Sequence, residues 1–430
     1  MKFSTILSTA IFSILCSLPL TAQYVPVPAP AQTQPVVIMG AMAHLGNGQV
    51  IENSVVAFEQ GKFTVVDNIA IKRGFPNHKQ IDGTGMQLYP GFIAPNTTLG
   101  LQEIGAVRAT RDSRELGQFN PNIRSIIAYD TDSEITPTVR SMGVLMAEVV
   151  PQGGRISGSS SLVQLDAWNW EDAAYATDFS IHMNWPSSSS YNWRTHQMTH
   201  NEDFDDQLRE LENYFTQAQA YHQNPHPERV NLRFEAMKGL FDGSKRLFIH
   251  AGNVKSIQEA VLFAGKFQIT PTIVGGSDAW MITGFLKKHG VAIILDSTQR
   301  LPSRTDEDID QPFKTPAILH DAGLLYCQGH EGFWQIRNLA FQAGQAVPFG
   351  LPYEAAVQSL TLDAAKIMGI DKTCGSVEVG KDATFFLCAG DALDPRSSKV
   401  TRAFIQGREI SLDNKQEMLY RRFQQKYKGK

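Results

Sequence analysis

A repeated alternation of short apolar runs and longer amphipathic stretches, between residues 246 and 346, constrains the fold most strongly. Each apolar run lacks the polar alternation of a half-exposed strand, as expected for parallel strands buried on both faces. Each connection is long enough for a helix, and four such units in a row favour a closed (β/α) barrel over an open sheet. The predicted strands and helices are, in chain order, Arg246–His250, Ser256–Lys266, Ile269–Val274, Ala279–His289, Val291–Leu295, Pro316–Ala322, Leu324–Cys327 and Phe333–Ala346.

Shorter strand patterns lie near both ends of the chain. Val36–Met39, Val55–Phe58 and Phe63–Val66 are predicted strands before the barrel, and Thr384–Cys388 and Val400–Ile405 follow it. Neither group has enough strands to bury a core alone, so we expect one composite β-sandwich. The predicted fold class is α/β, a TIM-like (β/α)8 barrel with a β-sandwich formed by N- and C-terminal segments.

Composition and charge exclude several classes of protein. The chain has 430 residues and 42% hydrophobic content, which suits a large α/β domain and argues against wholesale disorder. With 39 Lys+Arg against 43 Asp+Glu, the net charge of -4 gives no reason to expect a nucleic-acid surface.

The first residues have the pattern of a cleaved signal peptide. Met1 and Lys2 give a positive start, residues 3–20 are mostly apolar, and Ala22 offers a small residue before a cut. Pro19 and the polar Pro-rich stretch that follows argue against a transmembrane helix. We expect export to the periplasm or the medium, cleavage near Ala22, and no stable membrane insertion.

Two other segments carry predictions. The run Gly153–Ser161 is rich in glycine and serine and lacks a phosphate-binding pattern, so it is predicted to be a plain loop. Near the C-terminus, Tyr420, Phe423 and Tyr427 fall on one face of a basic helix, which we expect to dock through that face.

The chain is divided into six parts on these grounds. They are a signal peptide at 1–22, a Pro-rich linker at 23–34, the first part of the sandwich at 35–88, the barrel at 89–369, the second part of the sandwich at 370–411, and a basic helix at 412–430.

Four motifs together resemble the amidohydrolase superfamily, near its imidazolonepropionase and prolidase-like branch. Residues 89–93 (YPGFI) resemble the strand that enters the barrel, and residues 247–251 (LFIHA) resemble the fifth barrel strand. Residues 361–369 and 375–383 (GSVEVGKDA) resemble the C-terminal signature. The resemblance runs from about Pro35 to Gly407 and implies a hydrolase acting on carbon–nitrogen bonds.

The resemblance also implies a metal site. In that superfamily, histidines and an aspartate at the ends of barrel strands hold one or two divalent ions, which activate a bound water and polarise the substrate carbonyl. This chain departs from the pattern, because Asn96 and Thr98 stand where a pair of histidines is expected. Residues 275–278 (GGSD) replace the sixth-strand histidine, and Gly329-His330 replaces the aspartate. Only His250 is retained, so we expect at most one weakly bound divalent metal such as zinc.

The candidate site residues follow from these positions. His250, His330 and Glu331 are candidate catalytic residues, and His250 is the candidate metal ligand. Each has an ordinary alternative, a hydrogen-bonded core histidine for His250 and an exposed loop pair for His330 and Glu331. The candidate substrate-binding residues are Asn96, Thr98, Asp278, Arg108 and Arg111.

A third histidine lies among aromatic residues. His182 precedes Trp185, and with other tryptophans nearby it is a candidate for a substrate pocket or for ordinary packing near the barrel mouth.

Two hypotheses therefore stand. The first is an exported amidohydrolase with a rebuilt or single-metal site that acts on a small-molecule substrate. The second is a catalytically inactive relative that binds a ligand or pairs with an active amidohydrolase subunit. Partners considered are therefore a small-molecule ligand and another amidohydrolase chain, in a homo- or hetero-oligomer. Metal content of the purified protein distinguishes them, because fold alone does not determine function.

Overall fold

The structure is a computed structural model that describes residues 27–70, 74–192, 194, 197–224, 226–302, 304 and 306–428. The predicted signal peptide, residues 1–22, lies outside the described residues, as do the first residues of the linker. Within the described ranges no helix is both long enough and apolar enough to cross a bilayer.

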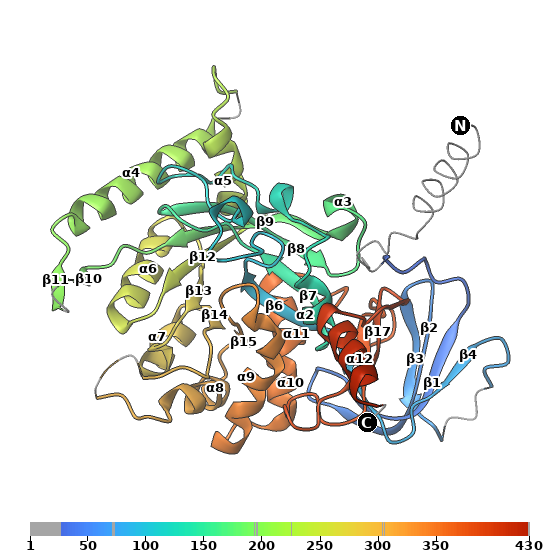
Figure 1. Cartoon of the computed structure of the whole chain (residues 1–430). Helices are drawn as coiled ribbons and strands as arrows, with labels where there is room; N and C mark the ends of the chain where they lie inside the picture. The colour runs from blue at the N-terminus through green and yellow to red at the C-terminus, as the bar shows by residue number, and fades with distance from the viewer. Residues whose placement is uncertain are drawn as a thin grey trace, which may run out of the picture.

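Eight strands form a nearly closed barrel sheet (Figure 1). An isolated parallel bridge between Thr97 and Gly332 brings the first and last strands together. The predicted TIM-like barrel is confirmed. In spatial order the strands are β6 (Phe92–Thr97), β7 (Val144–Val149), β8 (Ile156–Gln164), β9 (Ala174–Asn184), β12 (Arg246–Ala251), β13 (Thr272–Gly275), β14 (Ala292–Leu295) and β15 (Tyr326–Gln328).

Strand β8 differs from the prediction in two ways. It runs antiparallel to both β7 and β9, whereas the remaining neighbours in the barrel are parallel. The predicted loop at Gly153–Ser161 is wrong, because most of it belongs to this strand, in which every residue is buried. Serines fit inside the barrel because their hydroxyls find internal acceptors, for example Ser160 Oγ donating to Glu148 Oε1 at 2.7 Å.

Helices cover the outside of the barrel (Figure 1). Helix α6 shows why they form: the Asn253 side chain caps its first turn by accepting from Ser256 N, and Ile257, Val261 and Ala264 bury one apolar stripe. The α-helices of the described residues are α2 (Thr136–Arg140), α3 (Trp170–Ala173), α4 (Phe204–Gln223), α5 (Leu232–Asp242), α6 (Val254–Lys266), α7 (Thr283–Lys288), α8 (Gln311–Asp321), α9 (Leu339–Ala346), α10 (Tyr353–Leu360), α11 (Leu362–Met368) and α12 (Lys415–Tyr427). Strands β10 (Ser189–Asn192) and β11 (Gln197–His200) form a small separate hairpin.

A second sheet joins the two ends of the chain, as predicted (Figure 1). The C-terminal strand β16 pairs antiparallel with β5, so residues almost 300 positions apart are neighbours. Phe58, Phe385 and Phe404 pack ring against ring in the core of this sheet. Its strands are β1 (Val36–His44), β2 (Val50–Glu59), β3 (Lys62–Asn68), β4 (Lys79–Asp82), β5 (Gln87–Pro90), β16 (Phe385–Cys388), β17 (Val400–Ile405) and β18 (Arg408–Ile410).

Helix α12 is present, but the expected docking face is wrong. Tyr420, Phe423 and Tyr427 are 61%, 51% and 60% exposed, and the helix buries no residue. Its first turn attaches it to the barrel, where Thr138 Oγ1 donates to Gln416 Oε1 at 2.6 Å. Polar contacts beside α2 therefore hold this helix, and its aromatic face is turned to solvent.

Candidate functional site

The carboxyl ends of the parallel strands meet at one end of the barrel, where catalytic groups of barrel proteins are found. Backbone hydrogen bonds connect these ends: Asp278 N donates to Gly252 O at 2.9 Å, and Thr98 N donates to Gly332 O at 3.0 Å. The positions that end or follow strands β6, β12, β13 and β15 at this barrel mouth are Asn96, Thr98, His250, Asp278 and His330.

One side of the mouth is built on a buried cluster of Glu148, His182 and His250. Glu148 and His182 have no exposed surface, and His182 Nε2 lies 3.0 Å from Glu148 Oε1. His182 Nδ1 lies 3.0 Å from His250 Nε2. Strands β7, β9 and β12 each contribute one of these side chains, so the cluster crosses the barrel interior below the mouth.

Two further donors stabilise the Glu148 carboxylate. Ser160 Oγ donates to Oε1 at 2.7 Å, and the Asn96 backbone N donates to Oε2 at 3.0 Å. Asn96 has a φ of 52°, in the left-handed region that asparagine tolerates better than most residues. Burying a charge is costly unless it is fully hydrogen-bonded, and here both carboxylate oxygens have donors.

The hydrogen bonds determine how protons are arranged in this cluster. With Glu148 ionised, His182 donates through Nε2–H, so its Nδ1 accepts from His250 Nε2–H. Burial, together with His182, lowers the pKa of His250 to about 3. His250 is therefore neutral near pH 7, with only Nδ1 left to accept from a ligand, and it is a weak base.

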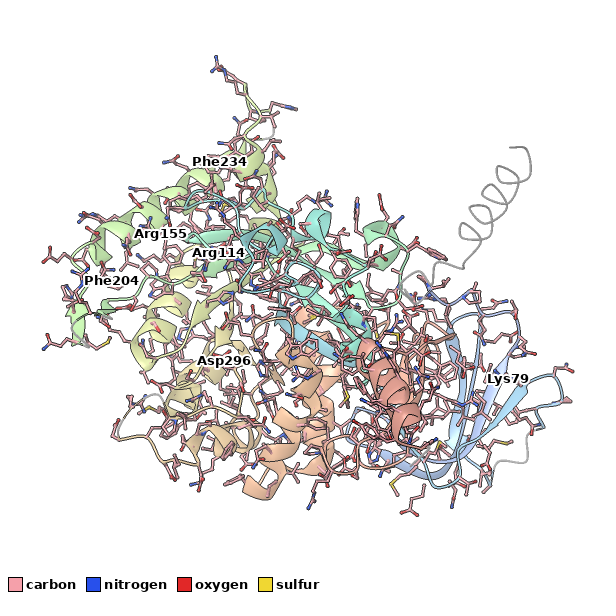
Figure 2. All side chains as sticks on the ribbon, viewed as in Figure 1. Lys79, Arg114, Arg155, Phe204, Phe234 and Asp296 are labelled. Atoms are coloured by element: carbon pink, nitrogen blue, oxygen red, sulfur yellow. The ribbon has the colours of Figure 1, made fainter. Side chains whose placement is uncertain are left out.

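The other side of the mouth holds Asp296, which directly follows β14 (Figure 2). Burial and the nearby Glu331 raise the pKa of Asp296, and Arg300 and His330 oppose that rise. Next to it is Gly275, where an added Cβ would lie 3.5 Å from Asp296 Oδ2. The Asp296 carboxyl thus occupies space beside the position where the resemblance expects a sixth-strand histidine.

The remaining candidates do not all face a common ligand. Asp278 is buried and its Oδ1 accepts from Arg304 at 2.5 Å, so its carboxylate is already paired. His330 Nδ1–H donates to the Glu331 carbonyl at 2.9 Å, and the Glu331 side chain is exposed. The side chains of Arg108 and Arg111 are exposed and make no hydrogen bond or ion pair with any described residue. No contact in the described residues connects the two arginines to the barrel-mouth residues.

Known structures share this architecture. An amidohydrolase from Thermotoga maritima MSB8 superimposes with a TM-score of 0.74 and 19% identity, over 87% of this chain and 99% of that one. The fold is that of the amidohydrolases. A prolidase complexed with n-methylphosphonate-L-proline (TM-score 0.53, 15% identity, 88% and 99% coverage) and a putative prolidase from Bifidobacterium longum (0.53, 14%, 92% and 100%) are also similar.

The sequence comparisons cover a smaller part of the chain. The amidohydrolase family model matches residues 335–410, which include the C-terminal signature and the strands that complete the second sheet. No curated protein sequence matches this chain. The resemblance inferred from the motifs is confirmed for the fold, and at these identities the similar structures do not establish the chemistry.

The residues present do not fit the metal centre that this fold often carries. Within the described ranges, no group of three or more His, Cys, Asp or Glu side chains is arranged to hold a metal ion. Asn96 and Thr98 offer neutral oxygen ligands, which suit a catalytic transition metal poorly. His250 Nε2 lies 3.0 Å from His182 Nδ1, and this hydrogen bond leaves His250 with Nδ1 as its one unbonded nitrogen.

Sequence reasoning missed Glu148 and Asp296, and it named His182 without its role in the buried cluster. Glu148 interrupts an otherwise apolar strand, a sign of a buried charge with partners. Asp296 comes directly after a predicted barrel strand, as His330 does, so a search for polar residues at strand ends would have identified it. His182 was considered only for its aromatic neighbours, and its bond to His250 could not be read from a separation of 68 residues.

Proposed function

We propose that this chain binds a small amide- or carboxyl-containing ligand at the barrel mouth, without the metal-assisted hydrolysis of active amidohydrolases. The observation that carries the proposal is the hydrogen bond from His250 Nε2 to His182, which continues to Glu148. His250 is the one metal ligand that the resemblance retains, and this bond makes it part of an internal polar cluster.

The chemistry of the mouth supports ligand binding. His250 Nδ1 is an acceptor for an amide N–H, and the Asn96 side chain adds a donor and an acceptor. His330 and Glu331 lie on the rim and contribute a partly exposed imidazole and a carboxylate. These groups recognise an amide or a carboxyl by hydrogen bonds, and the similarity to prolidase structures supports the same ligand class by analogy.

A second candidate function, metal-free hydrolysis of a carbon–nitrogen bond, is favoured by one observation. Burial and the nearby Glu331 raise the pKa of Asp296, so this carboxyl keeps its proton to a higher pH than an ordinary aspartate. In this alternative, Asp296 protonates the leaving nitrogen and Glu331 activates a water.

The experiment that tests the proposal measures binding and turnover on the same chelator-treated protein. We expect N-acetyl-leucine or glycyl-proline to bind by calorimetry, with no release of leucine, glycine or proline. His250→Ala should weaken this binding, whereas the matched control His226→Ala, at an exposed loop position, should leave it unchanged. Turnover that survives chelator and is lost in Asp296→Asn would support the second candidate, and turnover abolished by chelator would contradict both.

We also propose export, supported by the charged start, the apolar run at 3–20 and the small residue Ala22. N-terminal sequencing of protein recovered from the periplasm or medium should begin near Gln23. Recovery of chains that retain Met1 in those fractions would contradict export by cleavage.

A further inference from the structure

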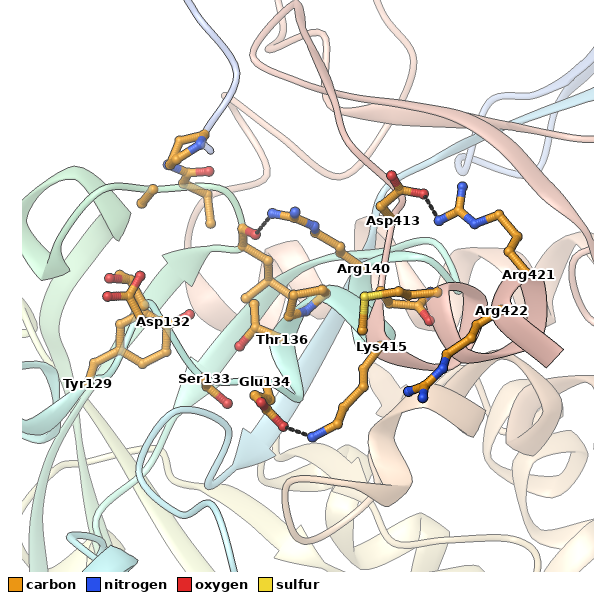
Figure 3. Close-up of a pocket in the computed structure, with 18 of the residues that line it drawn as sticks. Tyr129, Asp132, Ser133, Glu134, Thr136, Arg140, Asp413, Lys415, Arg421 and Arg422 are labelled. Atoms are coloured by element: carbon orange, nitrogen blue, oxygen red, sulfur yellow. Dashed lines mark hydrogen bonds and ion pairs between the residues drawn. The ribbon is translucent and has the colours of Figure 1, made fainter. Parts of the chain in front are cut away.

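A cavity of about 460 Å³ lies beside helix α12 (Figure 3). Its walls come from α12, from the segment that leads into α2, and from the residues that follow β8. Helix α2 precedes β7 and β8 runs antiparallel, so both walls lie at the amino-terminal ends of the parallel strands. This volume falls in the range of small-molecule sites.

The inner wall of the cavity combines apolar surface with two hydroxyls. Leu165, Pro137 and Met418 supply apolar contacts. The Tyr129 and Thr136 hydroxyls both line the cavity and lie close enough to interact with each other. Each hydroxyl can both donate and accept, so this pair can also take a polar group of a ligand.

Most of the charged groups around the cavity are already paired. Lys415 pairs with Glu134, Arg421 pairs with Asp413 at 2.6 Å, and Arg140 pairs with Asp166 at 2.8 Å. These pairs leave the walls close to electrically neutral.

Two opposite charges remain. The Asp132 carboxylate and the Arg422 guanidinium both line the cavity, and neither forms an ion pair or a side-chain hydrogen bond with a described residue. One belongs to the segment before α2 and the other to α12, as the close-up shows (Figure 3). The cavity thus presents one free anion and one free cation around an apolar interior.

We propose that this cavity binds a small zwitterion with an apolar body, namely a free amino acid or a dipeptide with apolar side chains. Arg422 receives the carboxylate, Asp132 receives the ammonium group, and Leu165 and Met418 contact the side chains. The Thr136 hydroxyl completes one hydrogen bond to the backbone of the ligand. This site is separate from the barrel mouth and does not depend on the function proposed there.

Calorimetry with leucyl-phenylalanine tests the proposal, in the wild-type chain and in His250→Ala, which weakens binding at the mouth. Arg422→Gln and Asp132→Asn should each weaken binding by roughly tenfold or more, as expected for the loss of a charge-assisted hydrogen bond. Lys426→Gln removes the same charge from α12 outside the cavity and should leave the affinity unchanged. The doubly capped probe N-acetyl-leucyl-phenylalanine amide should bind at least about tenfold more weakly than the free dipeptide.

A cavity-filling variant provides a second readout. Ala167 lines the cavity and is partly exposed, so Ala167→Trp should fold and exclude the dipeptide. Equal affinity in Ala167→Trp and wild type, or equal affinity for the free and capped probes, would overturn the proposal. No measurable heat with either probe would overturn it as well.

Discussion

The two sides of the barrel mouth differ in how their polar side chains are paired. On one side, Glu148, His182 and His250 form a closed chain of hydrogen bonds that leaves few groups without a partner. On the other side, Asp296 is partly buried, and desolvation together with the nearby Glu331 carboxylate raises its pKa. The first side is ordered by its own hydrogen bonds, and the second retains a carboxyl whose pKa is raised.

This difference predicts opposite responses to pH. The lowered pKa of His250 means that the unfolded chain binds the proton more readily, so this group favours folding above its unfolded pKa of about 6.5. The raised pKa of Asp296 means that the folded chain keeps the proton longer, so this group favours folding below an unfolded pKa of about 3.9.

The largest effect should come from removing the carboxylate of the closed side. Glu148→Ala leaves His182 and Ser160 without their acceptor, and should lower the free energy of unfolding by roughly 3–5 kcal/mol. Urea denaturation measures this change. Glu210→Ala, which breaks an exposed pair with Arg155, should cost under about 1 kcal/mol. Similar losses of unfolding free energy in the two variants would show that the buried cluster contributes no more to stability than an exposed ion pair.

The pH dependence of the closed side should be the next largest effect. As pH falls from about 6.5 towards 3, His250 should reduce stability by up to about 1.4 kcal/mol per pH unit. The slope should be present in wild type and missing in His250→Asn, as followed by urea unfolding at several pH values. An identical slope in the two proteins would assign the acid sensitivity to another group.

On the open side, Asp296→Asn should stabilise the protein near neutral pH. The amide removes a buried charge beside Glu331, and the expected gain is of the order of 1 kcal/mol. Stability of the wild type should fall as pH rises through and above the ordinary aspartate pKa, and the variant should lack that fall. A loss of stability in Asp296→Asn at neutral pH would mean that Asp296 has a stabilising partner.

The smallest effect concerns Asp278, whose carboxylate is paired with the partly exposed Arg304. Arg304→Gln should cost about 1 kcal/mol or less, since a partly exposed ion pair contributes little. Ligand affinity at the mouth should not change, because the Asp278 carboxylate is buried and already paired. A marked loss of affinity with unchanged stability would place Asp278 in the binding site.

Most of the fold could be predicted, because its signals are local. Buried apolar runs fixed the strands from Arg246 onward, and the resemblance of residues 375–383 placed the C-terminal strands. Strand β8 was missed because its serines resemble a loop until their internal acceptors are known. The site was predicted less well, since Glu148, His182 and His250 are far apart in the chain and meet only when the barrel closes.

The central claim is that an internal hydrogen-bonded cluster stands where active relatives of this fold hold metal. Elemental analysis of the purified protein, after incubation with zinc and exhaustive dialysis, tests it most directly. We predict well below one zinc per chain, with the same value in His250→Ala. Two zinc ions per chain, together with chelator-sensitive hydrolysis of an amide, would contradict the account.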